Sequence, residues 1–190
     1  MTQAAITPAA TPLCELPAEA LRVAATFAGS EVGLNHVSIR QSDNDGEVIV
    51  TGCSGLMCAE VRCDGQATAE LLLPIRPLRV ALRRLPAEHA SVVAGDEGMA
   101  TVRLYAEDST LAVSMPLAAE SGVRLPVVEP SDQVAQLAIS GAVLAQASAR
   151  LTSFGVLGVE TIGHGWMLSG EADGLRVRAL LAGIAPKPRP

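Results

Sequence analysis

The stretch LLPIRPLRVALRRL, residues 72–85, changes within a few residues from the pattern of a strand to that of a helix. It begins inside an apolar run, Leu71–Ile75, which predicts a short strand. Pro77 suits the first turn of a helix, where its missing N–H costs no hydrogen bond. The residues that follow place one apolar stripe on the helix: Leu78, Leu82 and Leu85. We therefore predict a strand followed by a helix over Pro77–Leu85.

The same plan occurs twice more. Helices are predicted over Pro17–Ala28 and Gly141–Thr152, after apolar stretches at Leu13–Leu16 and Leu137–Ile139, with Ser140 as an N-cap. Alternating segments separated by turn signals follow each helix and predict strands. Because internal repeats decide the fold, we expect an α+β protein of three β-α-β-β-β modules, with antiparallel sheets and the helices on one face.

The modules suggest a division of the chain. We expect residues 1–11 to form a flexible Ala/Thr/Pro arm and residues 186–190 to form a tail. Residues 12–130 hold a domain of two modules, and residues 131–185 hold a third, unpaired module. Between them lies Leu125–Pro130, whose two prolines exclude a helix and predict an extended linker.

Composition narrows the function. Apolar residues make up 49% and charged residues 18% of 190 residues, which indicates a globular, well-buried protein. The net charge of −6 argues against a protein that coats DNA indiscriminately, and 2% aromatics argue against stacking platforms for single strands. Without a signal peptide pattern or an apolar run of about 20 residues, we expect a cytoplasmic protein with no membrane partner.

Neither enzyme chemistry nor a cofactor is predicted. The three histidines are scattered, and no Ser/His/Asp order or glycine-rich phosphate loop has its required context. Cys53, Cys58 and Cys63 lack the paired C-x-x-C spacing of a structural zinc site. An odd spacing on strands points neighbouring cysteines to opposite faces. We therefore expect buried free thiols, no metal and no catalytic residue.

Three stretches resemble the bacterial DNA polymerase III β subunit, the DNA sliding clamp. Residues 72–85 resemble the strand-to-helix transition of a clamp module. Residues 111–115 and 123–130 are similar to the segment that closes one clamp domain and crosses to the next. Residues 48–59 are similar to a clamp strand that ends in a Thr-Asp-Gly turn, although Ser54 stands where the aspartate would be. The alternative is an unrelated α+β protein whose repeats are accidental products of an Ala/Val/Leu-rich sequence.

The resemblance implies strands in an outer layer and helices that line a hole around duplex DNA. Contacts to phosphate would be weak and blind to sequence. On the second predicted helix, Arg79, Arg83 and Arg84 lie opposite the leucine stripe, and Arg76 joins them from the helix start. The first and third helices add Arg22 and Arg150. These six arginines are the predicted DNA-binding residues, and the other interpretation is a merely solvated charged face.

The resemblance has limits that affect function. Clamp chains of this family hold six modules, whereas this one holds three, and the family's peptide-binding pocket cannot be placed here. An unpaired third module would leave a sheet edge open, so we expect a homo-oligomer in which it pairs with the third module of a second chain. Four chains would match the module count of a ring.

Two hypotheses follow. The first is a non-catalytic, clamp-like protein of replication or repair that encircles or contacts the backbone of duplex DNA, with a polymerase or another replication protein as a further partner. The alternative is a clamp-fold interaction module that binds or modulates a replication partner without binding DNA.

Overall fold

The computed structural model describes residues 11–29, 35–54, 57–118, 140–154, 158–162 and 165–182. The first module consists of β1 (Pro12–Pro17), α1 (Ala18–Phe27), β2 (His36–Gln41), β3 (Glu47–Cys53) and β4 (Met57–Asp64). After the two-residue β5 (Gln66–Ala67), the second consists of β6 (Leu71–Pro74), α2 (Ile75–Arg84), β7 (His89–Ala94), β8 (Met99–Ala106) and β9 (Ser109–Pro116). The third contains α3 (Gly141–Leu151), the 3₁₀ turn η1 (Thr152–Phe154), β10 (Gly158–Ile162), β11 (Gly165–Ala172) and β12 (Leu175–Ala182).

The predicted α+β fold is confirmed, and the first two modules show the full β-α-β-β-β order. The predicted strand Leu137–Ile139 and the linker Leu125–Pro130 lie outside the described residues. Helix α2 begins at Ile75, two residues before the predicted start at Pro77. Pro77 is still compatible with it, because the first four N–H groups of a helix have no partner within the helix.

The strands form two antiparallel sheets. One has five strands in the order β5-β1-β7-β8-β9, and the other has seven in the order β10-β11-β12-β4-β3-β2-β6. The first two modules exchange their opening strands: β1 pairs with β7 of the second module, and β6 pairs with β2 of the first. This exchange joins the two modules into one domain.

The third module joins the first through β12, which pairs antiparallel with β4. This corrects the expectation of an unpaired third module, because the edge formed by β12 is covered within the chain. Among the described residues, the end strands of this sheet are β10, from the third module, and β6. The expected pairing with a second chain therefore concerns β10 alone.

Small residues allow the helices to lie close to the sheets. Gly52 of β3 lies beneath α1, where an added Cβ would stand 1.9 Å from the carbonyl oxygen of Ala24. Ala20 and Ala24 of α1 are fully buried, as is Phe27 at its end. This core has few aromatic residues, and its space is filled because small side chains let the helix backbone pack directly on the strand backbone.

The cysteine prediction is partly wrong. Cys53 and Cys58 stand directly opposite each other on β3 and β4, with Cα atoms 4.0 Å apart, and they form a disulfide. The alternation argument holds along one strand, whereas these residues lie on two strands of a hairpin. Cys14 and Cys63 are free and buried, as expected.

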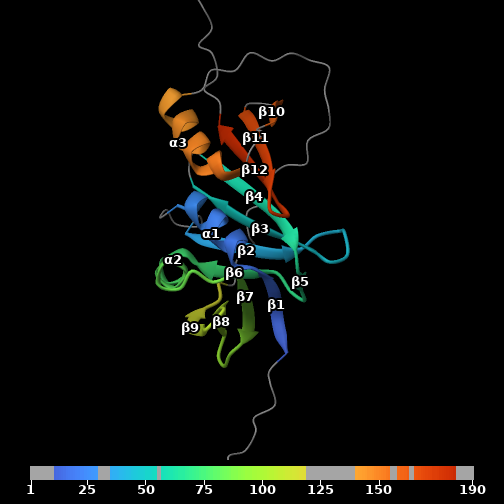
Figure 1. The fold of residues 1–190 in the computed structure, drawn as a ribbon, viewed down its shortest axis with the longest axis vertical. Helices are drawn as coiled ribbons and strands as arrows, with labels where there is room; N and C mark the ends of the chain where they lie inside the picture. The colour runs from blue at the N-terminus through green and yellow to red at the C-terminus, as the bar shows by residue number, and fades with distance from the viewer. Residues whose placement is uncertain are drawn as a thin grey trace, which may run out of the picture.

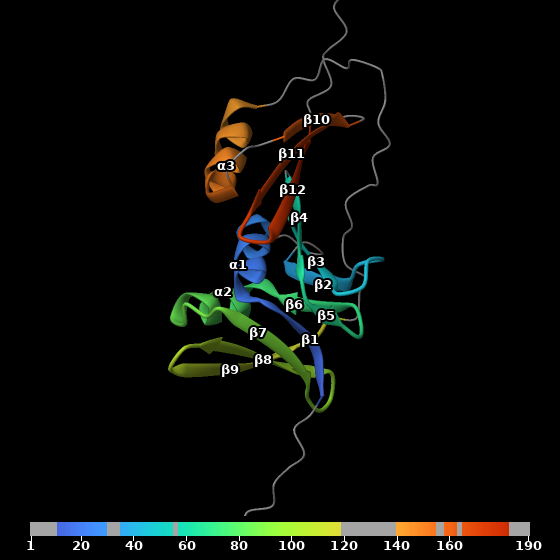
Figure 2. The same ribbon diagram turned by 45° about the vertical axis from the view of Figure 1, so that its right-hand side comes forward.

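All three helices lie on the same side of the strands, and they follow one another along the length of the molecule (Figures 1 and 2). Within the described ranges, no helix has the length and apolar character needed to cross a membrane.

Candidate nucleic-acid interface

Charge is divided unevenly between the helices and the rest of the chain. The three helices of the described residues carry six arginines and one glutamate, whereas the rest of the sequence includes 8 basic and 19 acidic residues. Because the helices share one side of the molecule (Figure 2), an acidic protein presents a basic face there. These six arginines are the ones predicted from the sequence.

A hollow of about 520 Å³ opens between the helices. Four arginines line it, drawn from all three helices: Arg22 of α1, Arg79 and Arg83 of α2, and Arg150 of α3. The other two, Arg76 and Arg84, line a second hollow of about 310 Å³ that lies between α2 and Val113 of β9. The structure therefore places four of the predicted residues around one hollow and the remaining two around a separate one.

Arg79 is bonded to backbone. Its Nε and Nη2 donate to the carbonyl oxygen of Ala25 at 3.0 and 2.7 Å, and Nη2 also donates to that of Ala28 at 2.8 Å. These carbonyl groups belong to the last turn of α1 and its C-cap, which lack partners within the helix. A cation at this end also suits the helix dipole.

Arg22 makes the matching contact in the opposite direction. It is the fifth residue of α1, as Arg79 is of α2, and its Nη2 donates to the carbonyl oxygen of Ala87, just after α2, at 3.3 Å. Arg22 also forms an ion pair with Glu19. The two arginines thus link each helix to the C-terminal end of the other.

Arg150 lies over the ring of Phe27, with its Cζ atom 5.2 Å from the ring centroid. This is a cation–π distance. Burial, and then the charge of Arg79, lowers the pKa of Arg150 from its usual value. An anion in the hollow would therefore meet a guanidinium that is partly deprived of water.

Arg76, Arg83 and Arg84 are exposed to solvent. They stand on a helix that has no acidic residue. An exposed arginine on such a surface can turn its planar fork toward a phosphate. These three side chains are the part of the face most available to a polyanion.

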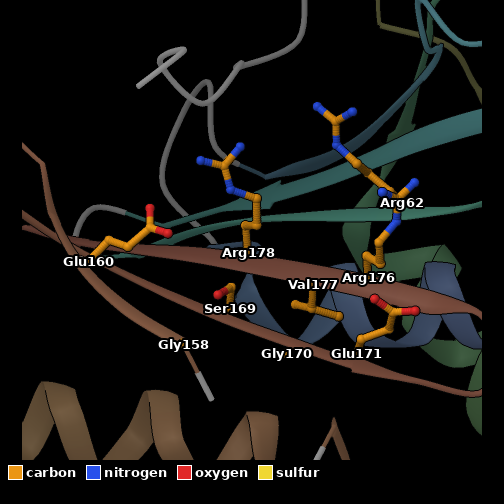
Figure 3. A pocket seen from close by; sticks show the side chains of 9 residues that line it. All are labelled: Arg62, Gly158, Glu160, Ser169, Gly170, Glu171, Arg176, Val177 and Arg178. Carbon is orange, nitrogen blue, oxygen red and sulfur yellow. The ribbon is translucent and has the colours of Figure 1, made fainter. Parts of the chain in front are cut away.

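A third basic group, which sequence reasoning missed, lies on the opposite face of the larger sheet. Arg62, Arg176 and Arg178 line a hollow of about 560 Å³ together with Glu160 and Glu171, as Figure 3 shows. The signal for it was the alternation Leu-Arg-Val-Arg at 175–178, which places two arginines on one face of β12.

Carboxylates compensate much of the charge on this sheet face. Glu47, 7% exposed, pairs with Arg62 and Arg176, and Glu60, 2% exposed, pairs with Arg40 and Arg62. The helix face, with a single glutamate on its helices, is therefore the better candidate for a polyanion. Among the described residues no group of three or more His, Cys, Asp or Glu side chains could hold a metal ion.

Comparison by sequence finds no matching protein family and no matching curated protein. Comparison of structures finds sliding clamps. The β chain of DNA polymerase III from Streptococcus pneumoniae matches with a TM-score of 0.63 and 10% identity, over 92% of this chain and 66% of that one. A DNA polymerase III β subunit from Eubacterium rectale matches with a TM-score of 0.63 and 10% identity, over 92% and 65%.

The Helicobacter pylori β clamp, solved with a DNA ligase peptide, matches with a TM-score of 0.55 and 9% identity, over 95% of this chain and 68% of that one. The chain therefore has the sliding-clamp fold, as its sequence predicted, and it spans about two thirds of the length of these clamps.

Proposed function

We propose that this chain, which has the fold of a sliding clamp, is a non-catalytic DNA-associated protein of replication or repair. Its helix face would meet the backbone of duplex DNA. The observation that carries the proposal is the concentration of six arginines on the three helices of an otherwise acidic protein. Contacts of this kind neutralise phosphates without reading bases.

The arginines have different parts in this interface. Arg76, Arg83 and Arg84 are exposed and would contact phosphates directly. Arg22 and Arg79 are bonded to helix ends, so they would add a fixed positive potential at the floor of the hollow. Arg150 would do both, since one side of it packs on Phe27.

Clamp function in this fold also requires an assembly, because one chain holds three modules. The sequence hypothesis pairs the third module with that of a second chain, and β10, the open end strand, is where this pairing would take place. We retain it as a proposal. A polymerase or another replication protein would be a further partner.

The test compares two double variants with the same change of charge. R83S/R84S removes two exposed arginines from the helix face. R103S/R178S removes one arginine from each sheet, in both cases on the side of the sheet that points away from the helices. Affinity for a fluorescent 30-base-pair duplex is measured by anisotropy at about 50 mM salt. The helix-face variant is expected to weaken binding about tenfold or more, whereas the sheet-face variant changes it less than twofold. Equal losses would contradict the proposed face.

One observation favours the second candidate, a protein-interaction module without DNA binding. Three of the six arginines already have partners within the chain, so only the other three are fully available to bind the phosphates of a duplex. Under this alternative the wild-type chain shows no duplex affinity at low salt. Capture of a replication protein on the immobilised chain would then support it.

A further inference from the structure

Among the residues that the structure describes, strand β9 (Ser109–Pro116) has a strand partner on one side only. It ends the five-stranded sheet, pairs with β8, and lies at the outer end of the fold below α2 (Figure 2). Its eight residues, STLAVSMP, include no charged side chain, and the only proline is the last residue. Native proteins usually protect such edges with charges, prolines or bulges. An edge of this length without protection is suited to pairing with another strand.

The chain itself shows how an equivalent edge is paired. β4 and β12 close the three-stranded meanders of the first and third modules, as β9 closes that of the second, and all three have eight residues. β4 and β12 pair antiparallel, with the fourth residue of one, Glu60, opposite the fourth of the other, Arg178. The first residue of β4, Met57, stands opposite the seventh of β12, Leu181. We call this β4–β12 pairing the seam between the first and third modules. It is symmetric about the fourth residue of each strand.

β9 has the pattern that this seam requires. Its third, fifth and seventh residues pack toward the core, namely Leu111, Val113 and Met115. The same positions of β4 and β12 are also buried. Two copies of β9 in the register of the β4–β12 seam would place Ala112 opposite Ala112 of a second copy, and Leu111 opposite its Val113. The core side and the exposed side of the sheet would each continue across the junction.

The helix above the edge gives an independent indication. Val23 and Val80 are the sixth residues of α1 and α2, yet Val23 is 6% exposed and Val80 is 50% exposed. Val23 lies one turn before Phe27, which Arg150 of the third module covers. Val80 lines the hollow beside β9 together with Val113. The second module thus exposes at Val80 an apolar position that the first module buries at Val23.

We propose that β9 pairs antiparallel with β9 of a second copy of this chain, with a two-fold axis at Ala112. The pairing joins two five-stranded sheets into one of ten strands and covers Val80. It uses a surface different from β10 of the third module, and it needs no DNA. Each chain would then have two self-complementary contacts, one at each end.

One residue at this junction opposes the pairing. Arg84 is the tenth residue of α2, the position of Phe27 in α1 and of Arg150 in α3, and those two are in contact. The β9 junction would bring two Arg84 side chains together. Their repulsion weakens the dimer at low salt, and a phosphate between them would relieve it.

Cysteine cross-linking of the full chain without DNA tests the register. An A112C variant should form a disulfide-linked dimer under mild oxidation, because the two new cysteines face each other across the axis. S114C is the matched control on the same exposed face, and it faces Thr110 of the second copy instead. Mixing T110C with S114C should restore the cross-link. Equal cross-linking of A112C and S114C, or none with A112C, would overturn the proposal.

Charge substitution provides a second test that does not depend on oxidation. A112E and A112K should each weaken self-association at least tenfold in analytical ultracentrifugation, because like charges stand directly opposite. An equimolar mixture should associate again as a heterodimer. R84F should tighten the wild-type association several-fold. A mixture no more associated than either variant alone would contradict the pairing, whatever the result with duplex DNA.

Discussion

Arg79 on α2 donates two hydrogen bonds to the carbonyl oxygen of Ala25 on α1, 54 residues earlier in the sequence. A side chain that the sequence assigned to a phosphate contact thus joins the two helices that form the floor of the candidate interface. The distinction matters, because loss of Arg79 would change both stability and binding.

The first prediction concerns this contact. Arg79→Met keeps most of the length of the side chain but removes its donors, and it leaves carbonyl groups of the α1 end without a partner. Charge-assisted bonds to buried groups contribute about 1.5–3 kcal/mol each, so we expect a loss of about 2–4 kcal/mol in the free energy of unfolding. Urea denaturation measures it. Arg83→Met, on the exposed part of the same helix, is the control and should cost less than about 0.5 kcal/mol. Equal effects would mean that the Arg79 bonds do not stabilise the domain.

The second prediction concerns the close packing of α1 on β3. Gly52→Ala would place a Cβ 1.9 Å from the carbonyl oxygen and 2.8 Å from the carbonyl carbon of Ala24. Because backbone cannot yield as a flexible side chain does, the helix must move, and we expect a loss of about 3 kcal/mol or more. Gly141→Ala is the opposite control, since a Cβ there meets nothing within 4 Å at the first position of α3. It should leave thermal stability unchanged or raise it slightly. A Gly52→Ala variant as stable as the wild type would contradict this packing.

The third prediction concerns Glu47, which holds the third module to the first. This buried carboxylate accepts a hydrogen bond from Ser42 at 2.8 Å and pairs with Arg62 and, across the seam, with Arg176. Glu47→Gln removes the charge partner of Arg176, which is half exposed, whereas Arg62 keeps its ion pair with Glu60, so we expect a cost of about 1 kcal/mol. We expect the seam to open more often, so that hydrogen exchange becomes faster in β12. Glu171→Gln, at an exposed position nearby, should change neither exchange nor stability, and faster exchange in both variants would contradict a specific role of Glu47.

The fourth prediction concerns pH. Burial raises the pKa of the Cys14 thiol to about 12, with a further contribution from Cys63, and burial and then Asp64 raise that of Cys63 to about 12. An unfolded chain ionises its thiols near pH 8.5, so it holds fewer protons than the folded chain between that pH and about 12. The stabilisation is complete below pH 8.5 and is lost as the pH rises toward 12, by up to about 1.4 kcal/mol per unit for each thiol. Unfolding measured from pH 8 to 10.5 should show this decline. The decline should become shallower in C14A/C63A, and an identical slope in that variant would contradict it.

The sequence predicted much of the fold because its local signals agree with the tertiary structure. The strand Glu47–Cys53 follows directly after the turn residues Asp43–Gly46, and α1 and α3 end within one residue of prediction. In each case, apolar periodicity and turn residues are sufficient to determine the element.

Relationships between distant segments could not be predicted in this way. The Arg79–Ala25 bonds, the Cys53–Cys58 pair and the β4–β12 seam each depend on which strands and helices become neighbours. Periodicity assigns a residue to a face but does not identify what that face meets. The sequence could therefore select the six arginines without separating the exposed ones from those that are bonded to helix ends.

The central claim, that the helix face contacts the DNA backbone, is tested most directly by the salt dependence of duplex binding. Affinity of the wild-type chain is measured from 50 to 200 mM salt on two duplexes of unrelated sequence. With three exposed arginines on phosphates, log K should fall with log salt at a slope of roughly −3 for each bound chain, equally for both duplexes. In R83S/R84S the slope should be shallower by about two. The absence of duplex binding at 50 mM salt, or a slope that these substitutions do not change, would contradict the claim.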